Sequence, residues 1–255
     1  MGGKIRDFIV IDFAEQKSWP DVGYAFREWR GKLQKHGVIV IVGNFPREEA
    51  RGFSLWNQEL VPMIVVSHNE VPSAQIFTLF HEFAHIILRS DAMCLKQAAD
   101  NLVGSIENWC NKVAASTLVP EKEFSNIVGK KNNNEWAVDD LYRVATRFKV
   151  SRHVIAIRLE DLGYVHKGYY QSIKNYLDPD DFAFIERKRK SDSEFKRNIP
   201  KERLAQVGFI AANAILEACR NSLLSTIEAA ELLKVKPDNF NTLFELASSQ
   251  QSKYG

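Results

Sequence analysis

The sequence predicts an α+β fold, with a small, mostly antiparallel sheet beside a long buried helix and a helical region after it. Three observations support this: short β-branched runs between residues 38 and 66, an apolar helical pattern from Val71 to about Arg89, and helical patterns through the C-terminal part of the chain. Runs rich in Val and Ile favour strands, whereas apolar residues spaced by three and four favour helices.

The first predicted helix covers residues 22–36, where large apolar residues recur at helical spacing before Gly37, a favourable C-capping residue. Three strands follow, at residues 38–42, 51–55 and 63–66. Gly and Pro residues separate them, and residues 57–59 predict a hairpin loop between the last two strands.

The next helix, from Val71 to about Arg89, carries apolar residues on more than one face, so we expect it to be buried on most sides. Further helices are predicted at residues 103–118, 139–148 and 151–162. The pattern changes after Tyr170, and a charged stretch precedes more helices. We therefore expect an α+β domain over residues 1–170 and a helical C-terminal domain over residues 171–255, with substrate docking or nucleic-acid sensing as candidate roles of the second domain.

Composition excludes several classes of protein. The net charge of +2 gives no general affinity for nucleic acid, and no segment approaches the length of a membrane span. The first residues have no apolar signal-peptide core. Three cysteines cannot all pair within one chain, so we expect reduced thiols and a cytoplasmic protein.

Residues 81–85, His-Glu-Phe-Ala-His, form an H-E-x-x-H motif inside the long predicted helix. Residues four apart lie on one helix face, so His81 and His85 can bind one zinc ion. Glu82 is displaced around the helix, where it can act as general base for a water molecule. The alternative is two histidines that cap the core or face solvent.

A catalytic zinc site needs a third protein ligand. The nearby acidic residues are Asp100, Glu107, Glu121 and Glu123. Glu107 is in the middle of the next predicted helix, where a partly buried carboxylate needs a partner. The spacing alone leaves open whether Glu107 binds zinc or pairs on the surface with Lys96 or Lys112.

Two segments resemble the ImmA/IrrE metallopeptidases. Residues 77–88 resemble the active-site helix of that family, and residues 106–120 resemble its second motif, E-x-x-A-N-x-F-A-A followed two residues later by L-x-P. Cys110 and Val113 replace the usual Ala and Phe, and Val119 breaks the usual Leu-Met-Pro ending. The resemblance covers about residues 20–170.

The resemblance implies a zincin-like core with Zn²⁺ as cofactor and Glu107 as the third ligand. It also implies an endopeptidase that cleaves a helix-turn-helix transcriptional repressor, so that stress, mobile-element or phage-defence genes are expressed. The rival hypotheses are a DNA-responsive regulatory module and a toxin–antitoxin module, each with a non-catalytic zinc site. The intact Glu82 argues against the regulatory module, because a purely structural zinc site needs no base.

Cys110 follows Glu107 by three residues, on the same helix face. Its thiolate could occupy the open zinc position as an inhibitory fourth ligand. The alternative is a small buried residue that packs as an apolar group, which is the commoner role of a free cysteine.

A run of basic residues, Arg187, Lys188, Arg189 and Lys190, opens the charged stretch that reaches Arg203. We expect it either to contact the phosphates of single-stranded DNA as an activating signal or to serve as a solvated linker. His68 and His153 are further candidates, for oxyanion stabilisation or for surface roles.

Overall fold

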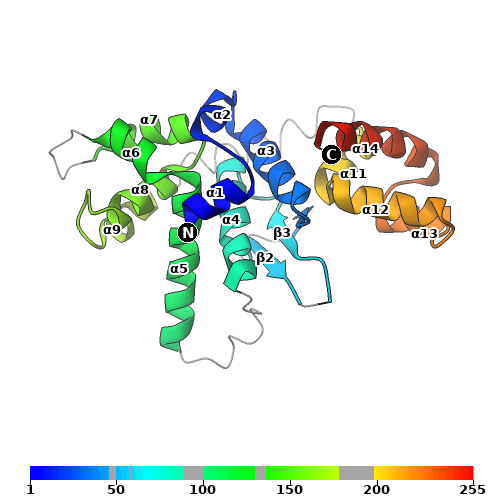
Figure 1. Cartoon of the computed structure of the whole chain (residues 1–255), viewed down its shortest axis with the longest axis horizontal. Coiled ribbons are helices and arrows are strands. Elements are labelled where there is room, and N and C mark those ends of the chain that lie inside the picture. Colours follow the sequence, from blue (N-terminus) through cyan, green and yellow to red (C-terminus); the bar gives the residue numbers. More distant parts are fainter. Residues whose placement is uncertain (46–49, 58, 89–99, 130–135, 178–197, 255) are drawn as a thin grey trace.

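The computed structural model describes residues 1–45, 50–57, 59–88, 100–129, 136–177 and 198–254. In chain order the elements are α1 (Gly2–Phe8), α2 (Phe13–Ser18), α3 (Val22–Lys35), β1 (Ile39–Gly43), β2 (Gly52–Leu55), β3 (Met63–Ser67), α4 (Pro72–Leu88), α5 (Asp100–Leu118), α6 (Glu121–Val128), α7 (Val138–Phe148), α8 (Arg152–Asp161), α9 (Tyr169–Leu177), α11 (Ile199–Val207), α12 (Phe209–Arg220), α13 (Thr226–Leu232), η2 (Pro237–Asn239) and α14 (Phe240–Tyr254). The sheet, α3, α4 and α5 occupy the middle of the molecule, with α6–α9 at one end and α11–α14 at the other (Figure 1). The predicted α+β fold is confirmed.

The three strands form one mixed sheet in the order β1-β3-β2. β2 and β3 form the expected antiparallel hairpin, with Gly52 opposite Val66 and Leu55 opposite Met63. β1 and β3 are parallel, from Ile39 opposite Met63 onward, so only one of the two pairings is antiparallel. β3 is the central strand and four of its five residues are buried, whereas β2 lies at an edge of the sheet.

Helix α4 is the central element of the main hydrophobic core. Its residues Ile76, Leu79 and Phe80 are fully buried, as the all-round apolar pattern predicted. The ring of Phe80 packs edge-on against Trp29 of α3 at a centroid distance of 5.0 Å. α5 packs on another side of α4, and β2 and β3 also contact it. These contacts hold the helix rigidly enough to orient its polar side chains.

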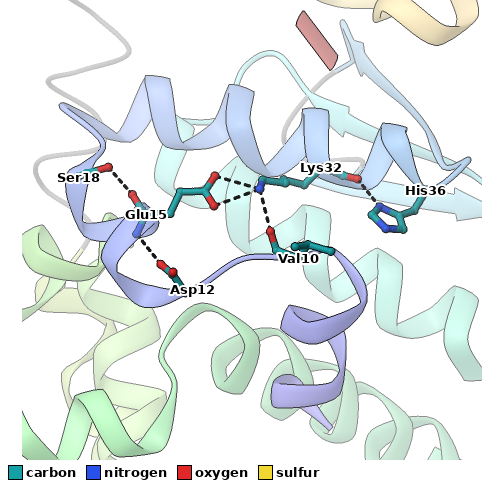
Figure 2. A network of polar contacts seen from close by, with 6 residues as sticks. All are labelled: Val10, Asp12, Glu15, Ser18, Lys32 and His36. Atoms are coloured by element: carbon teal, nitrogen blue, oxygen red, sulfur yellow. Dashed lines mark hydrogen bonds and ion pairs between the residues drawn. The ribbon is translucent and has the colours of Figure 1, made fainter. Parts of the chain in front are cut away.

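The segment before α3 is held by polar contacts rather than by packing alone (Figure 2). Asp12 caps α2 by accepting a hydrogen bond from the backbone N–H of Glu15 at 2.7 Å. The ammonium of Lys32 donates to the carbonyl of Val10 at 2.8 Å and pairs with the Glu15 carboxylate at 3.0 Å. This network joins the turn after α1 and the start of α2 to the last turn of α3.

The C-terminal helices have a hydrophobic core of their own, which includes Leu204, Phe209, Leu216 and Leu243. The main core extends to Leu177, beyond the expected boundary at residue 170. We therefore place the proposed boundary after α9 rather than within it, and the division into two domains stays a prediction.

A buried arginine joins the C-terminal helices to the rest of the chain. The Arg30 guanidinium donates to the carbonyl of Val40 on β1 and to the carbonyls of Ala205 and Gln206 on α11. Burial lowers the pKa of Arg30 to about 10. Because backbone carbonyls satisfy its donors, this cation holds α11 against β1 without a carboxylate partner in the described residues.

Candidate metal centre

Three side chains from α4 and α5 converge on one point. The Nε2 atoms of His81 and His85 lie 3.2 Å apart. Glu107 places one carboxylate oxygen 3.1 Å from Nε2 of His81 and the other 3.3 Å from Nε2 of His85. In the described part of the chain, these three residues form the group of His, Cys, Asp and Glu whose ligand atoms lie within 4.8 Å of one another.

The donor set fits zinc. Donor atoms arranged tetrahedrally at 2.0–2.1 Å from a zinc ion are separated by about 3.3–3.4 Å, close to the observed separations. Two imidazoles and one carboxylate also match the ligand types of catalytic zinc sites, which leave one position open. The site could therefore hold a zinc ion with little movement of these side chains.

Burial differs across the centre. His85 is buried, whereas the Glu107 side chain is 45% exposed, so the centre is accessible to solvent on the side of α5. The Nδ1 atom of His85 has no hydrogen-bond partner among the described residues. No described hydrogen bond at Nδ1 fixes the tautomer of this ring. A metal bond at Nε2 would do so.

Asn111 holds the other side of the His81 ring. Its Oδ1 lies 3.0 Å from Nδ1 of His81. Because an amide oxygen only accepts, Nδ1 donates and Nε2 keeps its lone pair for the metal. Asn111 occupies the Asn position of the E-x-x-A-N-x-F-A-A motif, but the sequence alone indicated no role for it. The available signal was its spacing of four residues from Glu107.

Glu82 points to a different neighbour from the two histidines. The hydroxyl of Ser54, on edge strand β2, donates to Oε2 of Glu82 at 2.9 Å. Burial raises the pKa of Glu82 and the charge of Glu107 acts in the same direction, whereas the Ser54 hydrogen bond and His85 oppose the shift. A carboxylate with a raised pKa that is held by one hydrogen bond is suited to accept and return a proton.

A cavity of about 590 Å³ opens beside His81 and Glu82. It extends past β2 and Asn111 to α8 and α9, where His153 and Tyr170 form part of its wall. This volume is in the range of ligand-binding pockets. His153 therefore lines the same cavity as the catalytic candidates, whereas His68 lines a separate cavity between α3 and α11.

Cys110 lies in the hydrophobic core and is fully buried. Burial raises the pKa of its thiol to about 12, and the charges of Glu107 and Glu82 add to the effect. Both observations favour the packing role over the inhibitory one, although the zinc-ligand hypothesis stays a prediction. The basic run Arg187–Lys190 lies outside the described residues, so its role also stays a prediction.

One of three comparisons with known proteins covers the residues of the candidate metal centre. A model of the peptidase M78 family, described as the IrrE N-terminal-like domain, matches residues 33–160. A search of curated proteins finds no match. A solved structure, a Mycobacterium tuberculosis transcriptional regulator, aligns at 17% identity with a TM-score of 0.37, over 62% of this chain and 60% of that chain. The chain thus spans less than two thirds of that protein, and at this TM-score the likeness carries no further information.

Proposed function

Because the chain belongs to the peptidase M78 family, we propose that it is a zinc-dependent endopeptidase whose metal ligands are His81, His85 and Glu107. The observation that supports this most directly is the separation of 3.1–3.3 Å among the three donor groups.

Among the described helices, none has both the length and the apolar character that a membrane-spanning helix needs.

The residues around the metal have distinct roles in this proposal. When bound, zinc would supply a Lewis acid for the scissile carbonyl and lower the pKa of a water molecule to about 7. Glu82 would accept a proton from the attacking water and donate it to the leaving amine. Ser54 orients the Glu82 carboxylate, and Asn111 orients the His81 ring.

Strand β2 is suited to align a peptide substrate. The backbone N–H of Ser67 donates to the carbonyl of Arg51, so residues 51, 53 and 55 direct their polar groups toward β3. The backbone groups of Gly52 and Ser54 then face the outer edge, which no strand of the described sheet covers. An extended peptide could pair with them beside Glu82.

We propose that the substrate is a helix-turn-helix transcriptional repressor, as the family resemblance implies, and that single-stranded DNA activates the cleavage. The test is to incubate the zinc-loaded protein with the repressor encoded beside its gene, with and without single-stranded DNA, and to analyse the products by mass spectrometry. We expect one specific cleavage that Glu82→Gln abolishes while zinc stays bound.

Three outcomes would contradict parts of this proposal. An intact repressor in the presence of zinc and DNA would exclude it as the substrate. Equal cleavage by the Glu82→Gln variant would remove Glu82 from the mechanism and indicate a contaminating protease. Activation that persists when Arg187, Lys188, Arg189 and Lys190 are neutralised would separate DNA sensing from this basic run.

A further inference from the structure

Helix α9, which forms the far wall of the active-site cavity, is fixed to α8 at both ends. Glu160 accepts hydrogen bonds from the backbone N–H groups of Gly168 and Tyr170 at 3.0 Å each, where α9 begins. Arg152 donates to the carbonyl of Leu177, where α9 ends, at 2.8 Å. Because both ends are held, the face that α9 presents to the cavity is determined.

That face carries a cation. Tyr170 and Lys174 are four residues apart, so they lie on the same side of α9, and both line the cavity. Nδ1 of His153 lies 3.3 Å from the hydroxyl of Tyr170. Arg51 adds a second cation on the β2 side, where it pairs with Glu70 at 3.7 Å.

Among the residues that the structure describes, no carboxylate pairs with Lys174. Among the described residues that line the cavity, Glu82 is the one acidic group. Glu160 uses both oxygens to cap α9, and Asp161 pairs with Arg158 at 2.6 Å and with Lys112 at 3.8 Å. Within the described chain, the Lys174 ammonium has no ion-pair partner, although it borders a cavity with apolar walls.

The part of the cavity beside α8 and α9 therefore has an apolar wall and a basic end. Phe77 of α4 and Val154 and Ile157 of α8 supply the apolar surface. We propose that this part of the cavity is a specificity subsite for an acidic side chain of the peptide substrate, with Lys174 as its charged partner. The methylenes of a Glu or Asp side chain would contact the apolar wall, and its carboxylate would meet the ammonium.

This inference rests on the proposed peptidase function and is tested with a degenerate peptide library. The zinc-loaded protein cleaves the library, and mass spectrometry counts the residues at each position around the cleaved bonds. Because Lys174 is exposed, we expect Asp and Glu to be enriched by at most about fivefold at one position, as for a surface ion pair. Lys174→Glu should replace that preference by one for Lys and Arg, and Lys174→Met should remove it.

Lys167→Glu is the matched control, because Lys167 is an exposed lysine just before α9 that does not line the cavity. It should keep the preference of the unmodified protein. Cleavage without any acidic preference, or a preference that Lys174→Glu leaves unchanged, would overturn the subsite but not the peptidase.

A second measurement separates the two proposals when no peptide is cleaved. The zinc-loaded Glu82→Gln variant, immobilised, captures peptides from the same library without turning them over. Enrichment of acidic peptides that Lys174→Glu reverses would support the subsite even if the proposed function fails. Equal capture of acidic and neutral peptides would overturn the subsite.

Discussion

Glu107 and Asn111, one turn apart on α5, contact opposite nitrogens of the same imidazole, that of His81. A Glu107 oxygen lies 3.1 Å from Nε2, and the Asn111 amide oxygen lies 3.0 Å from Nδ1. Residues four apart share a helix face, so a single docking of α5 against α4 supplies both contacts. The orientation of His81 is therefore controlled by α5 rather than by the helix that carries it.

Asn111→Leu should weaken zinc binding by about 10- to 100-fold, because the ring of His81 loses the partner that fixes its tautomer and orientation. Competition with a chromophoric chelator measures the zinc affinity. Asn108→Leu is the matched control, since Asn108 is exposed on the same helix. An Asn111→Leu variant with unchanged zinc affinity would show that Asn111 does not position His81.

Glu82→Gln should stabilise the metal-free protein at neutral pH. Burial raises the pKa of Glu82, so the folded state binds more protons than the unfolded state between the two pKa values. The free energy of unfolding therefore falls as pH rises through that window, and the ionised carboxylate stays destabilising above it. Melting temperatures should be higher for Glu82→Gln at pH 7 and should converge below about pH 4.

The control for this pH dependence is Glu59→Gln, which changes an exposed carboxylate. Its melting temperature should follow the unmodified protein at every pH. A Glu82→Gln variant that is no more stable than the unmodified protein at neutral pH would contradict the raised pKa.

Gly52→Ala should impair both stability and turnover, because β2 and α4 touch at this position. A Cβ atom at Gly52 would lie 2.5 Å from Cγ2 of Thr78 and 2.8 Å from the carbonyl oxygen of Val65. We expect a loss of about 1–3 kcal/mol in the free energy of unfolding, measured by urea denaturation. Gly104→Ala is the control, as no atom of the described residues lies within 4 Å of its added Cβ, and it should not destabilise.

Cys110→Ala distinguishes the two roles considered for this residue. Its complete burial predicts a loss of about 1 kcal/mol in stability, with unchanged activity per bound zinc. A resting activity several-fold higher than that of the unmodified protein would instead support the inhibitory role. Cys219→Ala, at a partly exposed site in the C-terminal helices, controls for general effects of removing a thiol.

Arg30→Met should loosen the attachment of α11, because the carbonyls of Val40, Ala205 and Gln206 would lose their donor. An unpaired buried carbonyl costs about 1–3 kcal/mol. Hydrogen exchange of α11–α14, followed by mass spectrometry, should accelerate. Arg27→Met, at an exposed position of the same helix, should leave it unchanged. Unchanged exchange in Arg30→Met would show that apolar packing alone holds α11.

Much of the candidate site could be predicted because it is local. The H-E-x-x-H spacing places His81 and His85 on one face of α4 and Glu82 beside them, through the helical repeat alone. Glu107 needed the family resemblance, since spacing could not exclude a surface pair with lysine. The predicted helix at residues 103–118 is part of α5, whose assigned start lies three residues earlier.

Contacts between distant segments could not be predicted in this way. The order β1-β3-β2 makes β1 and β3 parallel, and no local pattern specifies which strand becomes central. The short helices α1 and α2 depend on tertiary contacts such as those of Lys32, because isolated helices of this length are unstable.

The sequence by itself therefore determined the chemistry available on α4, since side-chain direction along a helix follows from residue number. Only the tertiary structure decided what surrounds that chemistry. Gly52, Asn111 and Lys174 come from three different elements, and the packing of those elements against α4 and α8 brings them to one cavity. Packing depends on the whole core at once, so its outcome is absent from any short stretch of the chain.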